Sequence, residues 1–338
     1  MPVTISDIAK KAKVSQSTVS RVLNGSGYVK EETKNRIEAV IKELNYTPSA
    51  IARSLSKRET NAIGVIVPDI TNSYFGEVIK GISQVADKNN LNIIFYNTEN
   101  SFEKEIRALN LLKEQRIKGI IMTPGFGADD FDSTYKEIIE SLQCPLILAC
   151  ADVNSTELNG VFVDNIKGAY DSVKLLIERG HKRIGILLGP LSSEPMSQRL
   201  LGYKKALKEA DIEINDKYIL DGQFSMEKAY ELTKKLLDSK DKPTALITSS
   251  NRMTMGAIKA LKENNKNIPE DLAIVAFDKV DLLDVLGIRI TYIDECPMEL
   301  GRNSMNLLCD IFNDSDKNFK RRVIIVPKLI IKGSEKKR

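Results

Sequence analysis

The sequence has few of the residues on which many catalytic and disulfide-stabilised proteins depend. It contains one histidine, His181, and four cysteines, Cys144, Cys150, Cys296 and Cys309, among 338 residues. A single histidine argues against a zinc-ligand cluster and against a histidine-dependent catalytic triad. The cysteines show neither CxxC spacing nor a disulfide framework, so we expect reduced, mostly structural thiols.

Long apolar runs are also absent. No stretch approaches the ~18 residues that cross a bilayer, and residues 1–10 are polar with a helical pattern, unlike a secretory signal. The composition, 42% hydrophobic and 28% charged, is that of a globular protein. The sequence therefore predicts a cytoplasmic protein of about two to three domains.

Signatures of nucleotide-dependent enzymes are missing as well. Gly125-Phe126-Gly127 lacks the third, properly spaced glycine of a dinucleotide fingerprint, and the chain has no GxxxxGK[ST] motif. His181 lies in a Gly-His-Lys-Arg segment that leads into a predicted strand, where a structural role is expected. Because little acid/base machinery is visible, we expect a protein that is not an enzyme and that needs neither cofactor nor metal.

Charge is unevenly distributed along the chain. Residues 1–60 carry eleven Lys or Arg against six Asp or Glu, whereas residues 61–330 carry 35 basic and 39 acidic side chains. A basic amino-terminal segment ahead of a mildly acidic body favours contact with a polyanion such as nucleic acid. A solvated charged surface is the alternative, and charge alone does not separate the two.

The basic segment has the periodicity of three short helices. Apolar residues recur there at helical spacing in three groups that can close one small core. The groups are Ile5, Ile8, Ala9 and Ala12; Val14, Val19, Val22 and Leu23; and Ile37, Val40, Ile41 and Leu44.

A tight turn separates the first two of these helices. Lys13-Val14-Ser15 leaves no room for a longer connection, and Ser15 can cap a second helix that begins at Gln16. The outer face of that helix is polar and has no acidic residue: it carries Gln16, Ser17, Thr18, Arg21 and Asn24. Such a unit reads DNA when its second helix is polar outside. An ordinary helical hairpin is the alternative.

Beyond a short segment from Ser49 to Ser56, apolar β-rich runs alternate with amphipathic helices. The alternation predicts doubly wound parallel sheets, one over residues 61 to about 160 and one over about 162 to 288. The last part of the chain adds strands and a helix from Pro297 to Phe312, and can recross between the lobes. The predicted strands are Ile63–Val67, Ile93–Tyr96, Gly119–Met122, Leu146–Cys150, Ile184–Leu188, Ala245–Thr248 and Leu272–Phe277.

Several motifs together resemble the lactose-repressor/galactose-repressor family of bacterial transcription regulators. The amino-terminal run Thr4-Ile5-Ser6-Asp7-Ile8-Ala9 and the run Val14 to Asn24 carry the most specific part of the resemblance. Leu44-Asn45-Tyr46-Thr47-Pro48 continues it, and Ile63 to Asp69, Val163-Asp164-Asn165 and Gly180 to Ile184 extend it through the body. The resemblance covers essentially the whole chain.

The resemblance implies an all-α helix-turn-helix headpiece, a hinge helix and a two-lobed α/β core folded like periplasmic sugar-binding proteins. It places the headpiece at residues 1–47 and the hinge at 48–60. The first lobe would span 61–161 with 289–322, and the second 162–288 with 323–338. A homodimer on a pseudo-palindromic DNA operator is implied, with a small-molecule effector, such as a sugar, bound between the lobes.

Residue roles follow from matching positions. Gln16, Ser17 and Arg21 would read base edges, as suits bidentate Arg–guanine and Gln–adenine pairs. Leu55, with Ala52 beside it, would wedge into the minor groove; a buried helix anchor is the alternative. Contacts to phosphates would come from polar groups near helix ends: Thr4, Ser15, Thr18, Ser20, Asn24 and Thr33.

The effector cleft would combine aromatic faces with charged groups that fix hydroxyls. For Tyr74, Phe75, Arg199 and Phe224 the structural alternatives are core packing, dimer contacts or a surface ion pair. Asp278 is the firmest candidate, because it ends an apolar strand. The full implied set is Asn72, Tyr74, Phe75, Ser193, Arg199, Phe224, Asn251 and Asp278.

Some positions depart from the family pattern. Cys150 replaces a usual Asp, Ser250-Asn251 replaces Asn-Asp, and Lys13 replaces a frequent turn glycine, at a cost of ~1 kcal/mol if the turn needs positive φ. Part of the family is governed by a phosphorylated carrier protein and has an Arg where this chain has Asn306. That difference disfavours a phosphocarrier protein as partner.

Overall fold

The computed structural model describes residues 3–46, 60–125, 133–153, 158–313 and 320–337. The chain forms two compact units, residues 1–60 and 61–338. The predicted hinge residues Ala52 and Leu55 lie outside the described residues. No helix in the described ranges is both long and apolar enough to span a membrane.

The first unit is the predicted three-helix headpiece. Its helices are α1 (Ile5–Ala12), α2 (Gln16–Asn24) and α3 (Glu31–Glu43), and all three contribute to one buried cluster. Ile8, Ala12, Val19 and Ile37 are fully buried in that cluster. The helical spacing of the apolar residues therefore predicted both the helices and their common core.

Capping residues fix where the headpiece helices begin and end. Thr4 and Asp7 form a reciprocal capping box at the start of α1, and the Ser15 hydroxyl accepts the Thr18 amide at the start of α2. Lys13 ends α1 in the left-handed region, at φ 55° and ψ 47°. The turn therefore does need the positive φ for which glycine is better suited.

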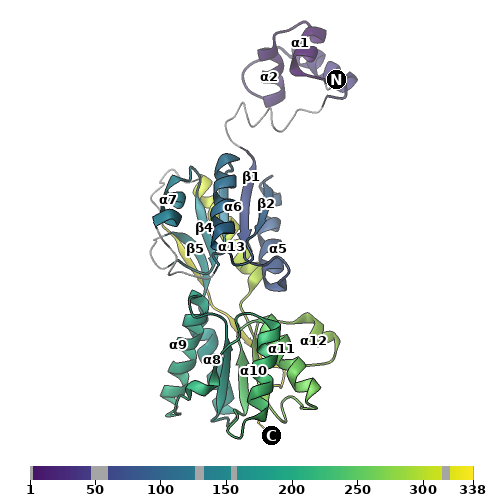
Figure 1. Ribbon diagram of the computed structural model, residues 1–338. Helices are drawn as coiled ribbons and strands as arrows, with labels where there is room; N and C mark the ends of the chain where they lie inside the picture. Colours follow the sequence, from purple (N-terminus) through teal and green to yellow (C-terminus); the bar gives the residue numbers. More distant parts are fainter. Residues whose placement is uncertain (1–2, 47–59, 126–132, 154–157, 314–319, 338) are drawn as a thin grey trace. The chain divides into compact units, whose positions relative to one another are not determined.

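The first lobe of the core is a six-stranded parallel sheet in the order β11-β5-β4-β3-β1-β2. Helices α5 (Ser73–Lys88) and α13 (Pro297–Asn313) cover one face, and α6 (Phe102–Glu114) and α7 (Ser133–Ser141) cover the other. Figure 1 shows α13 beside α5, although they are far apart in sequence. The strands are β1 (Ala62–Val67), β2 (Asn92–Asn97), β3 (Gly119–Met122), β4 (Leu146–Cys150), β5 (Asn159–Val163) and β11 (Arg322–Ile325).

The second lobe is a six-stranded sheet in the order β12-β10-β9-β8-β6-β7, in which only β12 runs antiparallel to its neighbour. Its strands are β6 (Ile184–Leu188), β7 (Ile219–Asp221), β8 (Ala245–Thr248), β9 (Ala273–Phe277), β10 (Thr291–Asp294) and β12 (Lys328–Ile330). Its helices are α8 (Asn165–Glu178), α9 (Glu194–Glu209), α10 (Met226–Asp238), α11 (Asn251–Glu263) and α12 (Asp281–Val285), with a 3-10 turn at Asp216–Tyr218. Helices α8 and α9 pack on one face, and α10, α11 and α12 pack on the other.

The predicted lobe boundaries need correction. Strand β10 pairs with β9 and belongs to the second lobe rather than the first. Strand β5 extends to Val163 in the first lobe, beyond the expected limit at 161, and all of β11, including residues 323–325, pairs with β5 there. The chain therefore crosses between lobes after Val163, after Asp294 and again between Ile325 and Lys328. An apolar run predicts a strand, but the pairing partner depends on tertiary contacts that the run does not encode.

Candidate functional site

Helix α2 presents a polar face opposite the headpiece core. Val19 is fully buried, whereas Gln16, Ser17 and Arg21 are exposed. The first turn of α2 has no acidic residue, and its last turn carries Arg21. This face can offer amide, hydroxyl and guanidinium groups to base edges without repelling phosphates.

The proposed phosphate-contacting hydroxyls lie mostly near helix amino termini. Thr4 precedes α1, Ser15 precedes α2, and Thr33 lies half-buried in the first turn of α3. The Ser15 hydroxyl also lies 2.8 Å from the hydroxyls of both Ser17 and Thr18. Helix amino termini present backbone N–H groups and a positive dipole end, which favour an anion.

Two further candidates for phosphate contact lie within α2. Ser20 is half-buried, and Asn24 is the last residue of the helix.

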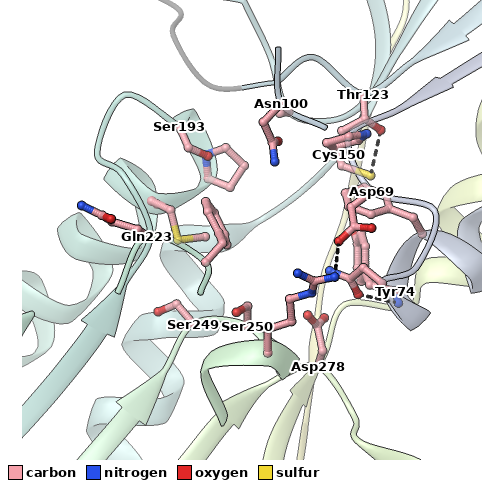
Figure 2. Close-up of a pocket in the computed structure, with 18 of the residues that line it drawn as sticks. Asp69, Tyr74, Asn100, Thr123, Cys150, Ser193, Gln223, Ser249, Ser250 and Asp278 are labelled. Atoms are coloured by element: carbon pink, nitrogen blue, oxygen red, sulfur yellow. Dashed lines mark hydrogen bonds and ion pairs between the residues drawn. The ribbon is translucent and has the colours of Figure 1, made fainter. Parts of the chain in front are cut away.

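In the core, a cavity of about 320 Å³ lies between the lobes and is lined from both sides. Cys150 ends β4, and Asp278 directly follows β9. The carboxyl ends of parallel strands border the crevice in which open α/β folds bind ligands. Figure 2 shows Cys150 and Tyr74 across the space from Ser193 and Ser249.

Seven of the eight predicted effector residues line this cavity: Asn72, Tyr74, Phe75, Ser193, Arg199, Phe224 and Asp278. The remaining candidate, Asn251, is directed at the opposite lobe instead. Several other polar residues that were not predicted from the sequence also line the cavity: Asn100, Thr123, Gln223, Glu227, Ser249 and Glu295. Three of these, Thr123, Ser249 and Glu295, directly follow strands, so strand ends were an available signal.

Arg199 is fixed in a buried network and is not a surface residue. Its Nε donates to Asn165 Oδ1 at 2.8 Å, and one terminal nitrogen donates to the Ser249 carbonyl at 2.7 Å. Its other terminal nitrogen lies 2.5 Å from Glu295 Oε1, and its guanidinium stacks 3.9 Å above the ring centre of Phe277. The surface ion pair considered for Arg199 is therefore wrong.

The floor of the cavity holds a second carboxyl group close to Glu295. Burial, followed by the charge of Glu295, raises the pKa of Asp278 well above its ordinary value. Asp278 adopts φ 68°, a left-handed conformation that Asp and Asn tolerate better than most residues. A single guanidinium, that of Arg199, thus faces two carboxyl groups.

The first-lobe side of the cavity combines a buried thiol and two aromatic rings with polar side chains. Burial raises the pKa of the Cys150 thiol to about 12, so the thiol is neutral near pH 7. Thr123 donates to its sulfur at 3.7 Å. Burial also raises the pKa of Tyr74 well above its usual range, and the Tyr74 ring meets Phe75 edge to face at 5.2 Å between centres. These rings can stack on an apolar ligand face.

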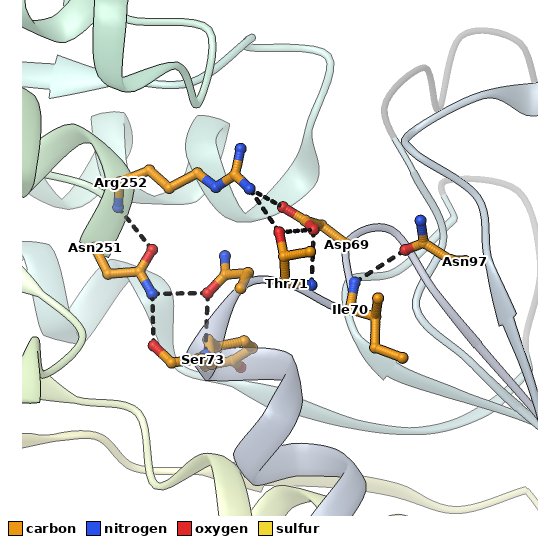
Figure 3. A network of polar contacts seen from close by, with 9 residues as sticks. Asp69, Ile70, Thr71, Ser73, Asn97, Asn251 and Arg252 are labelled. Carbon is orange, nitrogen blue, oxygen red and sulfur yellow. Dashed lines mark hydrogen bonds and ion pairs between the residues drawn. The ribbon is translucent and has the colours of Figure 1, made fainter.

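The lobes are also joined by polar contacts at the start of α11, which we call the interlobe bridge (Figure 3). Arg252 pairs with Asp69 at 2.8 Å and donates to Thr71 Oγ1 at 2.8 Å. Thr71 in turn donates to Asp69 Oδ1 from both its amide and its hydroxyl, which holds the acceptor loop in shape.

Asn251 supplies the second half of the interlobe bridge. Its Nδ2 donates to Asn72 Oδ1 at 2.7 Å and to Ser73 Oγ at 3.0 Å. Asn72 also caps α5 by accepting the Tyr74 amide. Asn251 is therefore placed to hold the lobes together rather than to line the cavity.

Comparison with known proteins assigns both units to one family. Residues 4–49 match the model for bacterial regulatory proteins of the lacI family. Residues 60–333 match the model for periplasmic binding proteins and the sugar binding domain of the LacI family. The chain belongs to the LacI family. It is a DNA-binding transcription regulator with a core of the effector-binding type.

Relatives in the LacI family match over nearly their full length. The chain is 33% identical over 315 residues to a catabolite control protein A of Priestia megaterium, covering 93% of each. It is 34% identical over 333 residues to a ribose operon repressor of Haemophilus influenzae, covering 98% of each. The lac repressor dimer bound to operator and an anti-inducer matches with a TM-score of 0.87 at 24% identity, over 99% of this chain and 100% of that one. At that identity the likeness shows the LacI-family fold alone.

Proposed function

We propose that this protein is an operator-binding repressor whose DNA affinity is set by a small molecule held between the lobes of its core. The observation that carries the proposal is the presence in one chain of an acid-free polar helix face and a cavity between the lobes lined by polar and aromatic side chains. A protein that only binds DNA would need no ligand cavity, and a protein that only carries a ligand would need no DNA-reading helix.

In this proposal Gln16, Ser17 and Arg21 read base edges, and Leu55 and Ala52 enter the minor groove. Phosphates are contacted by Thr4, Ser15, Thr18, Ser20, Asn24 and Thr33. The seven cavity-lining candidates bind the effector, and Asn251 acts through the interlobe bridge. A coupling of ~1–3 kcal/mol between effector and DNA is typical of such switches.

The protein would act as a homodimer on a pseudo-palindromic site. The lac repressor structure that it resembles is described as a dimer bound to operator. Leu282 and Val285 on α12 and Leu286 directly after it are 53%, 81% and 61% exposed, and this apolar cluster supports an additional contact surface. Action on chromosomal DNA implies a cytoplasmic location. The exposed Asn306 offers no cation to a phosphate, which disfavours a phosphocarrier protein as partner without excluding it.

The DNA half is tested with Arg21→Ala on duplexes selected from a palindromic random library. Losing one bidentate contact should weaken binding to the selected site about 5- to 150-fold per half-site and leave random duplex binding nearly unchanged. Lys42→Ala, which removes an exposed cation from the end of α3, is the matched control. It should bind the selected site in preference to random duplex as strongly as the wild type does. Equal losses on selected and random DNA would contradict the base-reading role.

The effector half is tested with Asp278→Ala. This variant should bind the selected operator normally but should no longer respond to the cellular small-molecule fraction that shifts the wild-type protein. Asp281→Ala, which removes an exposed carboxylate on α12, is the control and should respond normally. A wild-type response in Asp278→Ala would remove that residue from the site.

A further inference from the structure

The cavity between the lobes has an excess of acid. Among the described lining residues there is neither Lys nor His, and both guanidiniums are already paired: Arg199 with Glu295, and Arg252 with Asp69. The lining carboxyl groups are those of Asp69, Glu227, Asp278 and Glu295. An incoming anion would therefore find no unpaired cation on these walls.

Two buried polar atoms in the same cavity have no partner within the described part of the chain. Ser249 is 0% exposed, and its Oγ makes no hydrogen bond. Asn100 Oδ1 is likewise buried and unpartnered. Both residues line the cavity, Ser249 from the second lobe and Asn100 from the first (Figure 2). Because native proteins rarely leave such atoms unsatisfied, each of these atoms indicates a missing partner.

Ser249 is held in place independently of its hydroxyl. Its backbone carbonyl accepts a hydrogen bond from Arg199, whereas the next residue uses its own hydroxyl to cap α11 by accepting the Met253 amide at 3.2 Å. The free hydroxyl at position 249 thus has no structural bond to make, in contrast to that of Ser250. On the opposite wall, the Asn100 carbonyl oxygen can only accept.

Resting on the proposed function, we propose that Asn100 and Ser249 contact the effector, and that the effector carries no negative charge. The hydroxyl or amine hydrogens of the ligand would reach Asn100 Oδ1, Ser249 Oγ and the carboxyl of Asp278. A phosphate or carboxylate in the same place would face Asp278 and Glu295 with no free cation to offset them. Protonation of Asp278 lessens the excess of negative charge but frees no guanidinium.

The first test needs no ligand and compares the melting temperatures of two serine variants. Ser249→Ala removes an unpartnered group and should leave the melting temperature unchanged or raise it. Ser250→Ala removes a helix cap and should lower it. A drop for Ser249→Ala as large as that for Ser250→Ala would show that the Ser249 hydroxyl is structural, and would overturn its assignment to the effector.

The second test is a thermal-shift titration with matched compounds that differ in charge. The probes are glucose, glucosamine and glucose 6-phosphate; ribose and ribose 5-phosphate; and adenosine and adenosine monophosphate. The neutral or amine-bearing member of at least one set should stabilise the protein, and its phosphate should bind on the order of 100-fold more weakly. Asn100→Leu should weaken the active probe about tenfold, whereas Asn92→Leu on the exposed start of β2 should not.

The outcomes separate this inference from the proposed function. If a phosphate stabilises the protein as well as its parent compound does, the inference that the effector carries no negative charge is wrong. The proposed function is still supported if that phosphate also alters operator affinity. A panel in which no neutral or cationic member stabilises the protein also overturns the inference. The proposed function fails on a different observation, namely that no cellular small-molecule fraction changes operator affinity.

Discussion

Replacing Lys13 with glycine should stabilise the headpiece, because Lys13 ends α1 with φ 55°. A side chain with a Cβ costs about 1–2 kcal/mol in this left-handed conformation. Glycine removes that cost but gives back about 0.4–1 kcal/mol through the greater freedom of the unfolded chain. The net gain is about 0.5–1 kcal/mol. The exposed Lys13 side chain has no hydrogen bond or ion pair among the interactions described, so little is lost with it.

Hydrogen exchange of the full-length protein measures this gain directly. Amides of α1, α2 and α3 that exchange by unfolding of the headpiece should exchange about 2- to 5-fold more slowly in Lys13→Gly, while core amides serve as an internal reference. Lys13→Ala keeps the Cβ and removes the charge, so it should exchange like the wild type. If alanine slows exchange as much as glycine does, or if glycine has no effect, the backbone argument is refuted.

Three other perturbations test the core. The raised pKa of Asp278 adds stability at pH below the ordinary carboxyl pKa, and this contribution is lost as pH rises through the raised value. Asp278→Asn mimics the protonated group, so its advantage in melting temperature over the wild type should grow from pH 5 to pH 8; a constant difference would contradict the shift. A double-mutant cycle with Arg252→Gln and Asp69→Asn, followed by urea unfolding, should give a coupling of about 0.2–1 kcal/mol, because the Arg252 side chain is 48% exposed. A coupling energy of zero would show that the ion pair between Arg252 and Asp69 does not stabilise the protein. Gly81→Ala should destabilise the first lobe by about 1–3 kcal/mol in the same assay, since the new Cβ would lie 2.2 Å from a backbone carbonyl of α13. Gly76→Ala in the same helix meets nothing within 4 Å and should stabilise it instead.

Local pattern was sufficient to predict much of the fold. The runs Gly119–Met122 and Leu146–Cys150 are strands with the predicted bounds, because both are buried along their whole length and carry no conflicting turn residues. Residues 291–294 form a strand whose sheet could not be predicted. Its neighbours, β9 and β12, are chosen by contacts that bring distant segments together.

The site was predictable where its residues follow a family motif or a strand end. Asp278 satisfies both conditions, and it lines the cavity. Asn251 follows a family motif, but its amide donates to Asn72 of the opposite lobe. The sequence does not show that these two residues, 179 positions apart, lie in contact. Asn100 satisfies neither condition. Its importance depends on an unpartnered oxygen, which only the packed structure reveals.

The return of the chain through both lobes sets an order for folding during synthesis. Strands β11 and β12 border the first and second sheets respectively, and Glu335, close to the carboxyl terminus, is fully buried. A nascent chain of about 320 residues thus leaves β5 and β10 each with an open edge, and open edges invite pairing with other chains. The first sheet is completed only when β11 has been synthesised, and the second only when β12 has been synthesised. A chain truncated just before β11 should therefore yield aggregates rather than a protein with one intact lobe.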